Sequence, residues 1–175
     1  MEDASGFPEL MKLYNKFPMK ELIIHPRVQK DFYKNTPNLE MFAEAFAMST
    51  NPVCYNGDIF CVEDHQRICE RFPELDAVMS GRGTLTNPAL AREIRGGQAL
   101  TKAELRKFHD LVYHTYRAEV SGDRNVLFKM KELWFYMGPL FANNKKYLKK
   151  IKKSEKCIVY ESAVAELFSN EELIL

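Results

Sequence analysis

The fold of this 175-residue chain is decided by residues 51–88, NPVCYNGDIFCVEDHQRICERFPELDAVMSGRGTLTNP. Two short apolar runs in this stretch, 53–55 and 77–79, are each followed by a polar turn that contains glycine. The segment between them carries apolar residues at helical spacing, so the stretch predicts a strand, a turn, a helix, a strand and a second turn. A right-handed crossover makes the two strands parallel neighbours, and both glycine turns then open at the same carboxyl edge of the sheet.

These two turns, Asn-Gly-Asp at 56–58 and Gly-Arg-Gly at 81–83, have two interpretations. Glycine lets a backbone approach a ligand closely, and free N–H groups together with one arginine suit a phosphate. Asn-Gly and Gly-x-Gly are also common in ordinary turns. The spacing alone therefore leaves a phosphate site and a plain turn equally open.

The first 97 residues alternate between helix and strand signals. Apolar positions at three- and four-residue steps predict a helix over 7–14, and Leu22-Ile23-Ile24 predicts a buried strand that stops at His25-Pro26-Arg27. Thr36-Pro37 suits the N-cap and first position of a second helix, and Asn87 suits the cap of another. Such alternation predicts a parallel sheet covered by helices.

Strand signals become rare after residues 95–98, RGGQ, where the chain has its clearest boundary. A capping box at 101–104, TKAE, begins the region that follows, and residues 143–175 predict one or two further helices. The run 157–160, CIVY, is expected to flank a helix. The chain is therefore expected to hold two domains, an α/β domain over 1–97 and an all-helical domain over 98–175.

Composition indicates a globular protein without a strong overall charge. Hydrophobic residues make up 46% of the chain, which is ample for a core, and the formal net charge of +1 leaves only a local basic patch open. Four cysteines without CxxC spacing favour reduced thiols in a cytosolic protein, and no metal site is expected. No signal peptide or bilayer-spanning run of about 18 residues is expected, so we expect a cytoplasmic protein without membrane contact.

Several segments resemble the flavin-dependent tRNA-dihydrouridine synthases. The similarity rests on the turn at 56–58, on DAVMSGRG at 76–83 with Asn87-Pro88, and on ELIIHPR at 21–27 followed by DFY at 31–33. It implies a partial (β/α)8 TIM-type barrel of about three βα units, followed by a helical tRNA-binding domain. The resemblance further implies that eight residues bind the cofactor FMN around its phosphate: His25, Arg27, Asn56, Gly57, Asp58, Gly81, Arg82 and Gly83.

In that family NADPH reduces FMN, the flavin passes a hydride to a uracil ring flipped out of tRNA, and a cysteine supplies the proton. A (β/α)8 barrel has eight strands, whereas this sequence predicts three before its helical region. The resemblance therefore places Met1 after the fifth strand, implies no catalytic residue in this chain, and makes a separate polypeptide with the other strands a candidate partner. Two alternatives stay open: a non-catalytic tRNA-binding remnant, and another FMN- or phosphate-binding barrel protein.

Some of these residues have simpler explanations. His25 at a strand end suits a core or capped residue, although the match of HPR to the family favours the phosphate role. Asp58 is also a candidate N-cap of the following helix. Cys54 and Cys61 flank the first turn among apolar neighbours, so both are expected to be buried thiols.

A lysine-rich helix is expected over 145–153, KKYLKKIKK, with Leu148 and Ile151 as its apolar positions. Most charge runs are solvated faces, but seven lysines against one glutamate between 145 and 156 favour contact with RNA phosphates. The residues expected to contact tRNA are Lys145, Lys146, Lys149, Lys150, Lys152 and Lys153. Three aromatic residues upstream are expected in the core rather than as base-stacking surfaces: Trp134, Phe135 and Tyr136.

Overall fold

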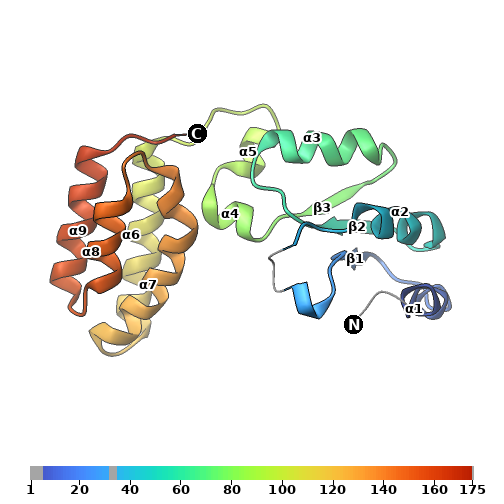
Figure 1. The fold of residues 1–175 in the computed structure, drawn as a ribbon, viewed down its shortest axis with the longest axis horizontal. Coiled ribbons are helices and arrows are strands. Elements are labelled where there is room, and N and C mark those ends of the chain that lie inside the picture. The colour runs from blue at the N-terminus through green and yellow to red at the C-terminus, as the bar shows by residue number, and fades with distance from the viewer. Residues whose placement is uncertain (1–5, 32–34, 175) are drawn as a thin grey trace. The chain divides into compact units, whose positions relative to one another are not determined.

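The computed structural model describes residues 6–31 and 35–174 and divides into two compact units, residues 1–81 and 82–175 (Figure 1). The first unit combines a small sheet with helices, and the described part of the second unit is dominated by helices. An α/β fold with a helical part is therefore confirmed. Residue 97, where the sequence places a boundary, lies inside the second unit. Phe32 and Tyr33, which contribute to the resemblance, lie outside the described residues.

A three-stranded parallel sheet forms the centre of the first unit. Its strands, in spatial order, are β1 (Leu22–Ile24), β2 (Val53–Asn56) and β3 (Ala77–Met79). Ile24 lies opposite Tyr55, and Asn56 lies opposite Met79. The parallel pairing expected from the two apolar runs is confirmed. Because the strands run in one direction, the turns that follow them gather at one edge of the sheet.

The helical segments of the first unit are α1 (Phe7–Tyr14), η1 (Gln29–Asp31), α2 (Leu39–Met48) and α3 (Val62–Arg71). The N-cap of α2 is Asn38, whose side-chain oxygen accepts a hydrogen bond from the Met41 N–H at 3.0 Å. The expected cap at Thr36 is therefore wrong. A carboxamide two residues later satisfies the first turn of the helix instead.

Aromatic side chains pack α2 and the end of α3 against β2. The Phe42 ring meets Tyr55 edge to face with centroids 4.8 Å apart, and it meets Phe72 in the same way at 4.9 Å. Burial raises the pKa of Tyr55 to about 12, so this phenol stays neutral. Edge-to-face pairs each add about 0.5–1.5 kcal/mol beyond area burial. The turn after β2 therefore follows closely on Tyr55, whose ring is packed in the core.

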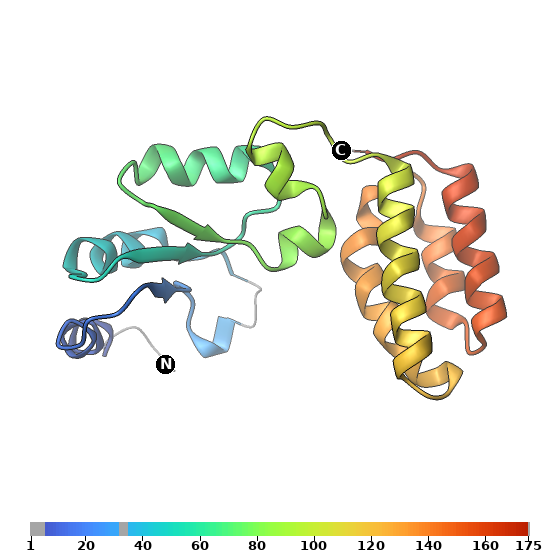
Figure 2. The same ribbon diagram turned by 180° about the vertical axis from the view of Figure 1, so that it is seen from behind.

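The helices of the second unit are α4 (Arg82–Thr86), α5 (Leu90–Ile94), α6 (Lys102–Glu119), α7 (Asp123–Met137), η2 (Gly138–Leu140), α8 (Lys145–Lys153) and α9 (Cys157–Asn170). The helices α6 to α9 run side by side as a bundle (Figures 1 and 2). Two helices after residue 143 are confirmed, but the run 157–160 forms the first turn of α9 and does not flank a helix. Gly83, expected in a turn, lies within the short helix α4.

Helix α6 begins as expected. The Thr101 hydroxyl accepts a hydrogen bond from the Glu104 N–H at 3.2 Å, and the Glu104 carboxylate accepts one from the Thr101 N–H at 2.9 Å. This reciprocal pair is the capping box predicted from the sequence. The expected cap at Asn87 is wrong, because Ala89 is the N-cap of α5 and has no side-chain cap. The Asn87 side-chain oxygen instead accepts from the Ala89 N–H at 2.9 Å, in the turn before the helix.

A buried chain of hydrogen bonds runs through the bundle core. The Trp134 indole N–H donates to the Tyr160 hydroxyl at 2.7 Å, and that hydroxyl lies 2.6 Å from Nε2 of His109. Nδ1 of His109 lies 2.8 Å from the carboxylate of Asp110, which also accepts from Arg106 at 2.8 Å. Burial lowers the pKa of His109 to about 4, so the ring is neutral. Tyr160 then donates to Nε2, Nδ1 donates to Asp110, and every member of the chain is satisfied.

The aromatic run on α7 divides between core and surface. Trp134 is buried as expected, and Tyr136 is half-buried. Phe135 is 76% exposed, so its expected place in the core is wrong. The buried side of α7 follows Met130, Trp134 and Met137. A residue next to Trp134 is rotated by about 100° around the helix, which turns Phe135 toward solvent.

Candidate functional site

The turns after β1 and β2 are joined by the side chain of Arg27. Its Nη2 donates to the Asp58 carboxylate at 2.5 Å, and its Nη1 donates to the same carboxylate at 3.1 Å. Nη1 also lies 3.2 Å from Nε2 of His25. The sheet therefore brings together three of the eight residues expected around a phosphate: His25, Arg27 and Asp58.

The contact with Arg27 sets the proton position on His25. A guanidinium can only donate, so Nε2 of His25 must accept. The imidazole is then neutral and carries its proton on Nδ1. His25 can therefore donate a hydrogen bond through Nδ1 alone.

Arg27 supports the turns rather than presenting an open cation. Its side chain is 4% exposed, and Nε and Nη2 both donate to the backbone oxygen of Asn35, at 2.9 and 2.6 Å. Asp58 is not the N-cap of α3, because Cys61 holds that position and the Asp64 carboxylate accepts from its N–H. The sequence did not reveal the pairing of Arg27 with Asp58, since the two lie 31 residues apart and no local pattern links them.

Glycine at position 57 is required by packing. A Cβ placed there would lie 2.0 Å from the hydroxyl oxygen of Tyr55, whose ring is fixed in the core. The preceding side chain, Asn56, reaches β3, where its Nδ2 lies 3.4 Å from Sδ of Met79. This turn therefore has a structural reason for its glycine, whether or not it binds a ligand.

Gly81 is different, because a Cβ at this position would meet nothing within 4 Å. The glycine follows Ser80, whose hydroxyl donates to the Ile59 carbonyl at 3.1 Å and so ties the turn after β3 to the turn after β2. The backbone at Gly81 is thus exposed and held in place by its neighbour. The position therefore has room beside the backbone that a side chain would fill.

Arg82 and Gly83 begin α4 and belong to the second unit. Arg82 is half-buried, whereas Gly83 is buried and its carbonyl accepts from the Asn87 N–H at 2.7 Å. Their participation in one site with His25 stays a prediction.

The four cysteines are free. Cys54 is buried, as expected, and burial raises the pKa of its thiol. Cys61 is exposed, so its expected burial is wrong: it lies at the N-cap of α3, outside the apolar interior. Within residues 6–31 and 35–174, no group of three or more His, Cys, Asp or Glu could hold a metal ion. No helix in the same ranges is long and apolar enough to cross a membrane.

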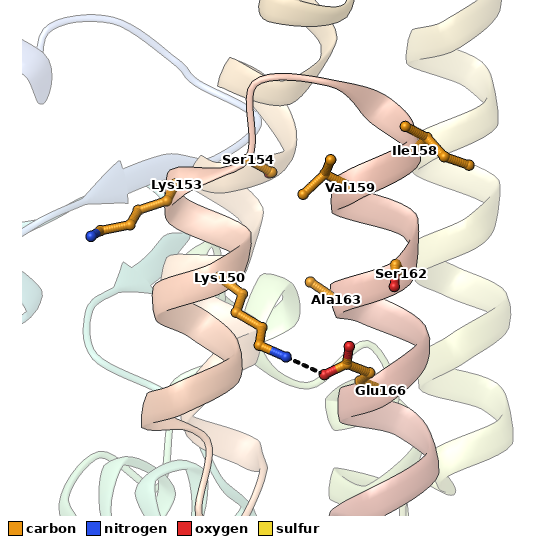
Figure 3. Close-up of a pocket in the computed structure, with 8 residues that line it drawn as sticks. All are labelled: Lys150, Lys153, Ser154, Ile158, Val159, Ser162, Ala163 and Glu166. Atoms are coloured by element: carbon orange, nitrogen blue, oxygen red, sulfur yellow. Dashed lines mark hydrogen bonds and ion pairs between the residues drawn. The ribbon is translucent and has the colours of Figure 1, made fainter.

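The six lysines expected to contact RNA are all exposed on α8, which is anchored by Tyr147 and Ile151. Helical spacing divides them into two rows. One row lies on the side of α9, since Lys150 pairs with Glu166 of α9 at 2.5 Å (Figure 3); its members by helical spacing are Lys146, Lys150 and Lys153. The outer row is turned further from α9, and its members are Lys145, Lys149 and Lys152.

The parallel sheet with its turns at one edge, followed by a helical unit, defines a class of α/β proteins that bind ligands beyond the strand ends. A sequence model of the family "Dihydrouridine synthase (Dus)" matches residues 8–171. This chain belongs to the dihydrouridine synthase family.

Three relatives illustrate the similarity. The chain is 35% identical over 78 residues to the tRNA-dihydrouridine(16) synthase of Pseudomonas syringae pv. tomato, which covers 45% of this chain and 24% of that protein. It is 34% identical over 96 residues to the protein of the same name from Shewanella oneidensis. That alignment covers 55% of this chain and 30% of the relative. It is 26% identical over 172 residues to a probable tRNA-dihydrouridine synthase of Helicobacter pylori. That alignment covers 95% of this chain and 50% of the relative. The chain thus spans half or less of the length of these relatives.

Proposed function

We propose that this chain forms part of a flavin-dependent tRNA-dihydrouridine synthase, which reduces uridine in tRNA to 5,6-dihydrouridine with FMN as cofactor and NADPH as reductant. In this proposal residues 1–97 supply part of the FMN-binding barrel, and residues 98–175 supply helices that bind tRNA. The observation that carries it is the parallel sheet whose turns open at one edge, in a chain of the dihydrouridine synthase family.

The turns fit the phosphate of FMN, with roles divided among them. The exposed backbone at Gly81 is open to approach, and Nδ1 of His25 and the Asn56 carboxamide are donors at the same edge of the sheet. Arg27 and Asp58 together add no net charge, so we assign them to positioning His25. Arg82 is the cation that we assign to the phosphate, with backbone contacts from Gly57 and Gly83.

When bound, FMN supplies the hydride for the uracil ring. The residues of this chain bind the phosphate group of the cofactor and contact the tRNA. The described residues contain three sheet strands, whereas a (β/α)8 barrel has eight, so we propose that polypeptide outside these 175 residues completes the ring pocket. We also place the proton donor there, since Cys54 is buried and Cys61 caps α3.

Reconstitution tests this function. The 175-residue chain is mixed with FMN, NADPH and unmodified tRNA, with and without a polypeptide carrying the other barrel strands of a relative. Mass spectrometry then measures dihydrouridine. We expect product only in the complete mixture, and we expect Arg82→Ala to lower FMN retention there while the exposed-surface control Arg124→Ala does not.

Each of the other outcomes has a distinct meaning. Product from the chain alone would contradict the proposal that other strands are needed. Binding of tRNA without product in the complete mixture would favour a non-catalytic tRNA-binding protein. FMN turnover without any affinity for tRNA would favour a flavin protein that acts on another substrate.

A further inference from the structure

A hydrogen bond from the Ser80 side chain joins the turns after β2 and β3. Its hydroxyl donates to the Ile59 carbonyl at 3.1 Å, although the two residues lie 21 positions apart in the sequence. Ile59 is buried, and its N–H donates to the Gly57 carbonyl at 3.0 Å. Ser80 is therefore attached to a turn that is itself held by a buried side chain and a backbone hydrogen bond.

This bond extends the connection between the two strands past the end of the sheet. The last residues that pair across β2 and β3 are Asn56 and Met79. Ser80 follows Met79 directly, whereas Ile59 lies in the turn that follows Asn56. The Ser80 hydroxyl therefore fixes the position at which the backbone leaves β3 relative to the turn after β2.

The backbone that leaves β3 is that of Gly81. This residue is exposed, and a Cβ there would meet no atom within 4 Å, so there is room beside its backbone. The proposed backbone contacts with the phosphate lie in both turns, at Gly57 and at Gly81. A phosphate that contacts two turns at once needs both at a fixed spacing, and a site that is ordered in advance avoids the cost of ordering them on binding. Ser80 holds this spacing.

A simpler explanation is that the bond only stabilises a turn, since serine hydroxyls commonly bond to nearby backbone groups. Such bonds are local, however, whereas the bond from Ser80 crosses between two parallel strands. Arg27 joins the turns after β1 and β2 in a similar way, through Asp58. Two side-chain contacts therefore connect all three turns at the carboxyl edge of this sheet.

We propose that Ser80 is a positioning residue for recognition of the FMN phosphate, through which the site prefers FMN to riboflavin, the flavin that lacks this phosphate. The Ser80 hydroxyl does not contact the phosphate. It holds the Gly81 backbone at the distance from the turn after β2 that a phosphate requires. This inference rests on the proposed function, because it assumes that these turns bind FMN.

Comparison of FMN with riboflavin separates positioning from general damage to the fold. The two flavins share the ring and the ribityl chain, so contacts with those parts cancel in the ratio of the two dissociation constants. A substitution that merely loosens the fold weakens the binding of both flavins alike. A loss of phosphate contacts weakens the binding of FMN alone.

The first experiment measures both dissociation constants by equilibrium dialysis. The sample is the complex of the 175-residue chain with the polypeptide that carries the other barrel strands. We expect the unsubstituted complex to prefer FMN, and Ser80→Ala to reduce this preference about 5-fold, because loss of one hydrogen bond changes an equilibrium constant by roughly 2- to 12-fold. Riboflavin affinity should stay within about 2-fold. An unchanged ratio in a folded Ser80→Ala complex would overturn the inference.

Two further variants serve as controls. Ser49→Ala removes a hydroxyl that donates to the Asn51 carbonyl at 2.9 Å before β2, at the amino edge of the sheet, and should leave the ratio within about 2-fold. Ser80→Thr keeps the hydroxyl and should keep the preference for FMN. Loss of this preference in a folded Ser80→Thr complex would overturn the inference, so the test stands even if Ser80→Ala does not fold.

The second experiment measures hydrogen exchange of the 175-residue chain without flavin. If Ser80 fixes the turns, Ser80→Ala should speed amide exchange at residues 57–59 and 80–81, whereas Ser49→Ala should not. Unchanged exchange together with a lower preference for FMN would mean that the hydroxyl contacts the phosphate itself, which would overturn the positioning role.

Failure of the proposed function gives a different result in the same measurements. If the unsubstituted complex binds FMN and riboflavin equally, these turns do not bind the phosphate, and both the proposed function and this inference fail. If the unsubstituted complex prefers FMN and Ser80→Ala keeps that preference, only the inference fails.

Discussion

Arg27 and Asp58 form an ion pair, with 2.5 Å between nitrogen and oxygen, that joins the turns after the neighbouring parallel strands β1 and β2. The Arg27 side chain is almost fully buried, and it also contacts His25 and the backbone of Asn35. One side chain therefore fixes two turns and the tautomer of a histidine. This relationship links two of the three turns at the carboxyl edge of the sheet.

We expect Asp58→Asn to destabilise the first unit by about 2 kcal/mol. The substitution leaves the buried Arg27 charge without its counter-ion, and hydrogen bonds to charged groups contribute about 1.5–3 kcal/mol. Urea denaturation of the 175-residue chain measures the free energy of unfolding. The control is Glu40→Gln, which breaks the exposed pair with Arg71 and should cost less than about 1 kcal/mol. Equal small losses for both variants would show that the Arg27 pair does not hold the turns.

Two glycine substitutions separate packing from ligand binding. Gly57→Ala drives a methyl group into the Tyr55 hydroxyl, so we expect a loss of about 1–3 kcal/mol in unfolding free energy. Gly81→Ala meets no atom within 4 Å and should leave stability within about 0.5 kcal/mol. In the complete reconstituted mixture, however, Gly81→Ala should lower FMN retention, because the methyl group blocks approach to the backbone. A stable Gly81→Ala variant with full FMN retention would remove Gly81 from the proposed phosphate site.

We expect this chain to self-associate through the outer strands of its sheet. Within the described residues β1 and β3 each pair only with β2, and their side chains Ile23 and Met79 are 44% and 40% exposed. Unpaired strand edges with apolar side chains favour association. We expect sedimentation velocity to detect oligomers that Ile23→Lys with Met79→Lys reduces, while Leu111→Lys on α6 does not. A monomeric unsubstituted chain would contradict this prediction.

The sheet could be predicted from the sequence because the residues that define each strand and its turn are close together in the chain. Each apolar run ends in a glycine-bearing turn, and the handedness of a strand–helix–strand crossover leaves one arrangement for 53–55 and 77–79. The same holds for the capping box at Thr101, where four consecutive residues contain the whole interaction. The sequence therefore also indicated which edge of the sheet carries the candidate site.

The partners within that site could not be predicted, since they depend on tertiary contacts. Arg27 and Asp58 meet through the register of β1 against β2, and the sequence does not state which of the nearby carboxylates will lie within reach. Phe135 is an error of another kind, because the helical phase set by Met130, Trp134 and Met137 already turns it outward. Composition favoured the core, whereas periodicity favoured the surface, and periodicity was correct.

Acid should destabilise the second unit through His109. Burial lowers the pKa of this histidine from 6.5 to about 4, so the unfolded chain binds a proton between these values and the folded bundle does not. The contribution of His109 to stability is therefore complete above pH 6.5 and is lost as the pH falls from 6.5 to about 4. The shift corresponds to about 3 kcal/mol. Burial is the largest cause of the shift; Asp110 raises the pKa of His109, whereas Arg106 and His114 lower it further.

A variant that lacks only His109 tests this directly. In His109→Gln the amide can accept from Tyr160 and donate to Asp110, but it does not titrate, so we expect its unfolding free energy to fall less between pH 6.5 and pH 4 than that of the unsubstituted chain. Urea denaturation across this pH range measures the difference. His114→Gln replaces an exposed histidine on the same helix and should change the slope only slightly, because His114 is the smallest of the causes that shift the pKa of His109. Parallel curves for His109→Gln and the unsubstituted chain would show that His109 does not titrate differently on folding, because any proton uptake unique to the unfolded state must appear as a difference in slope.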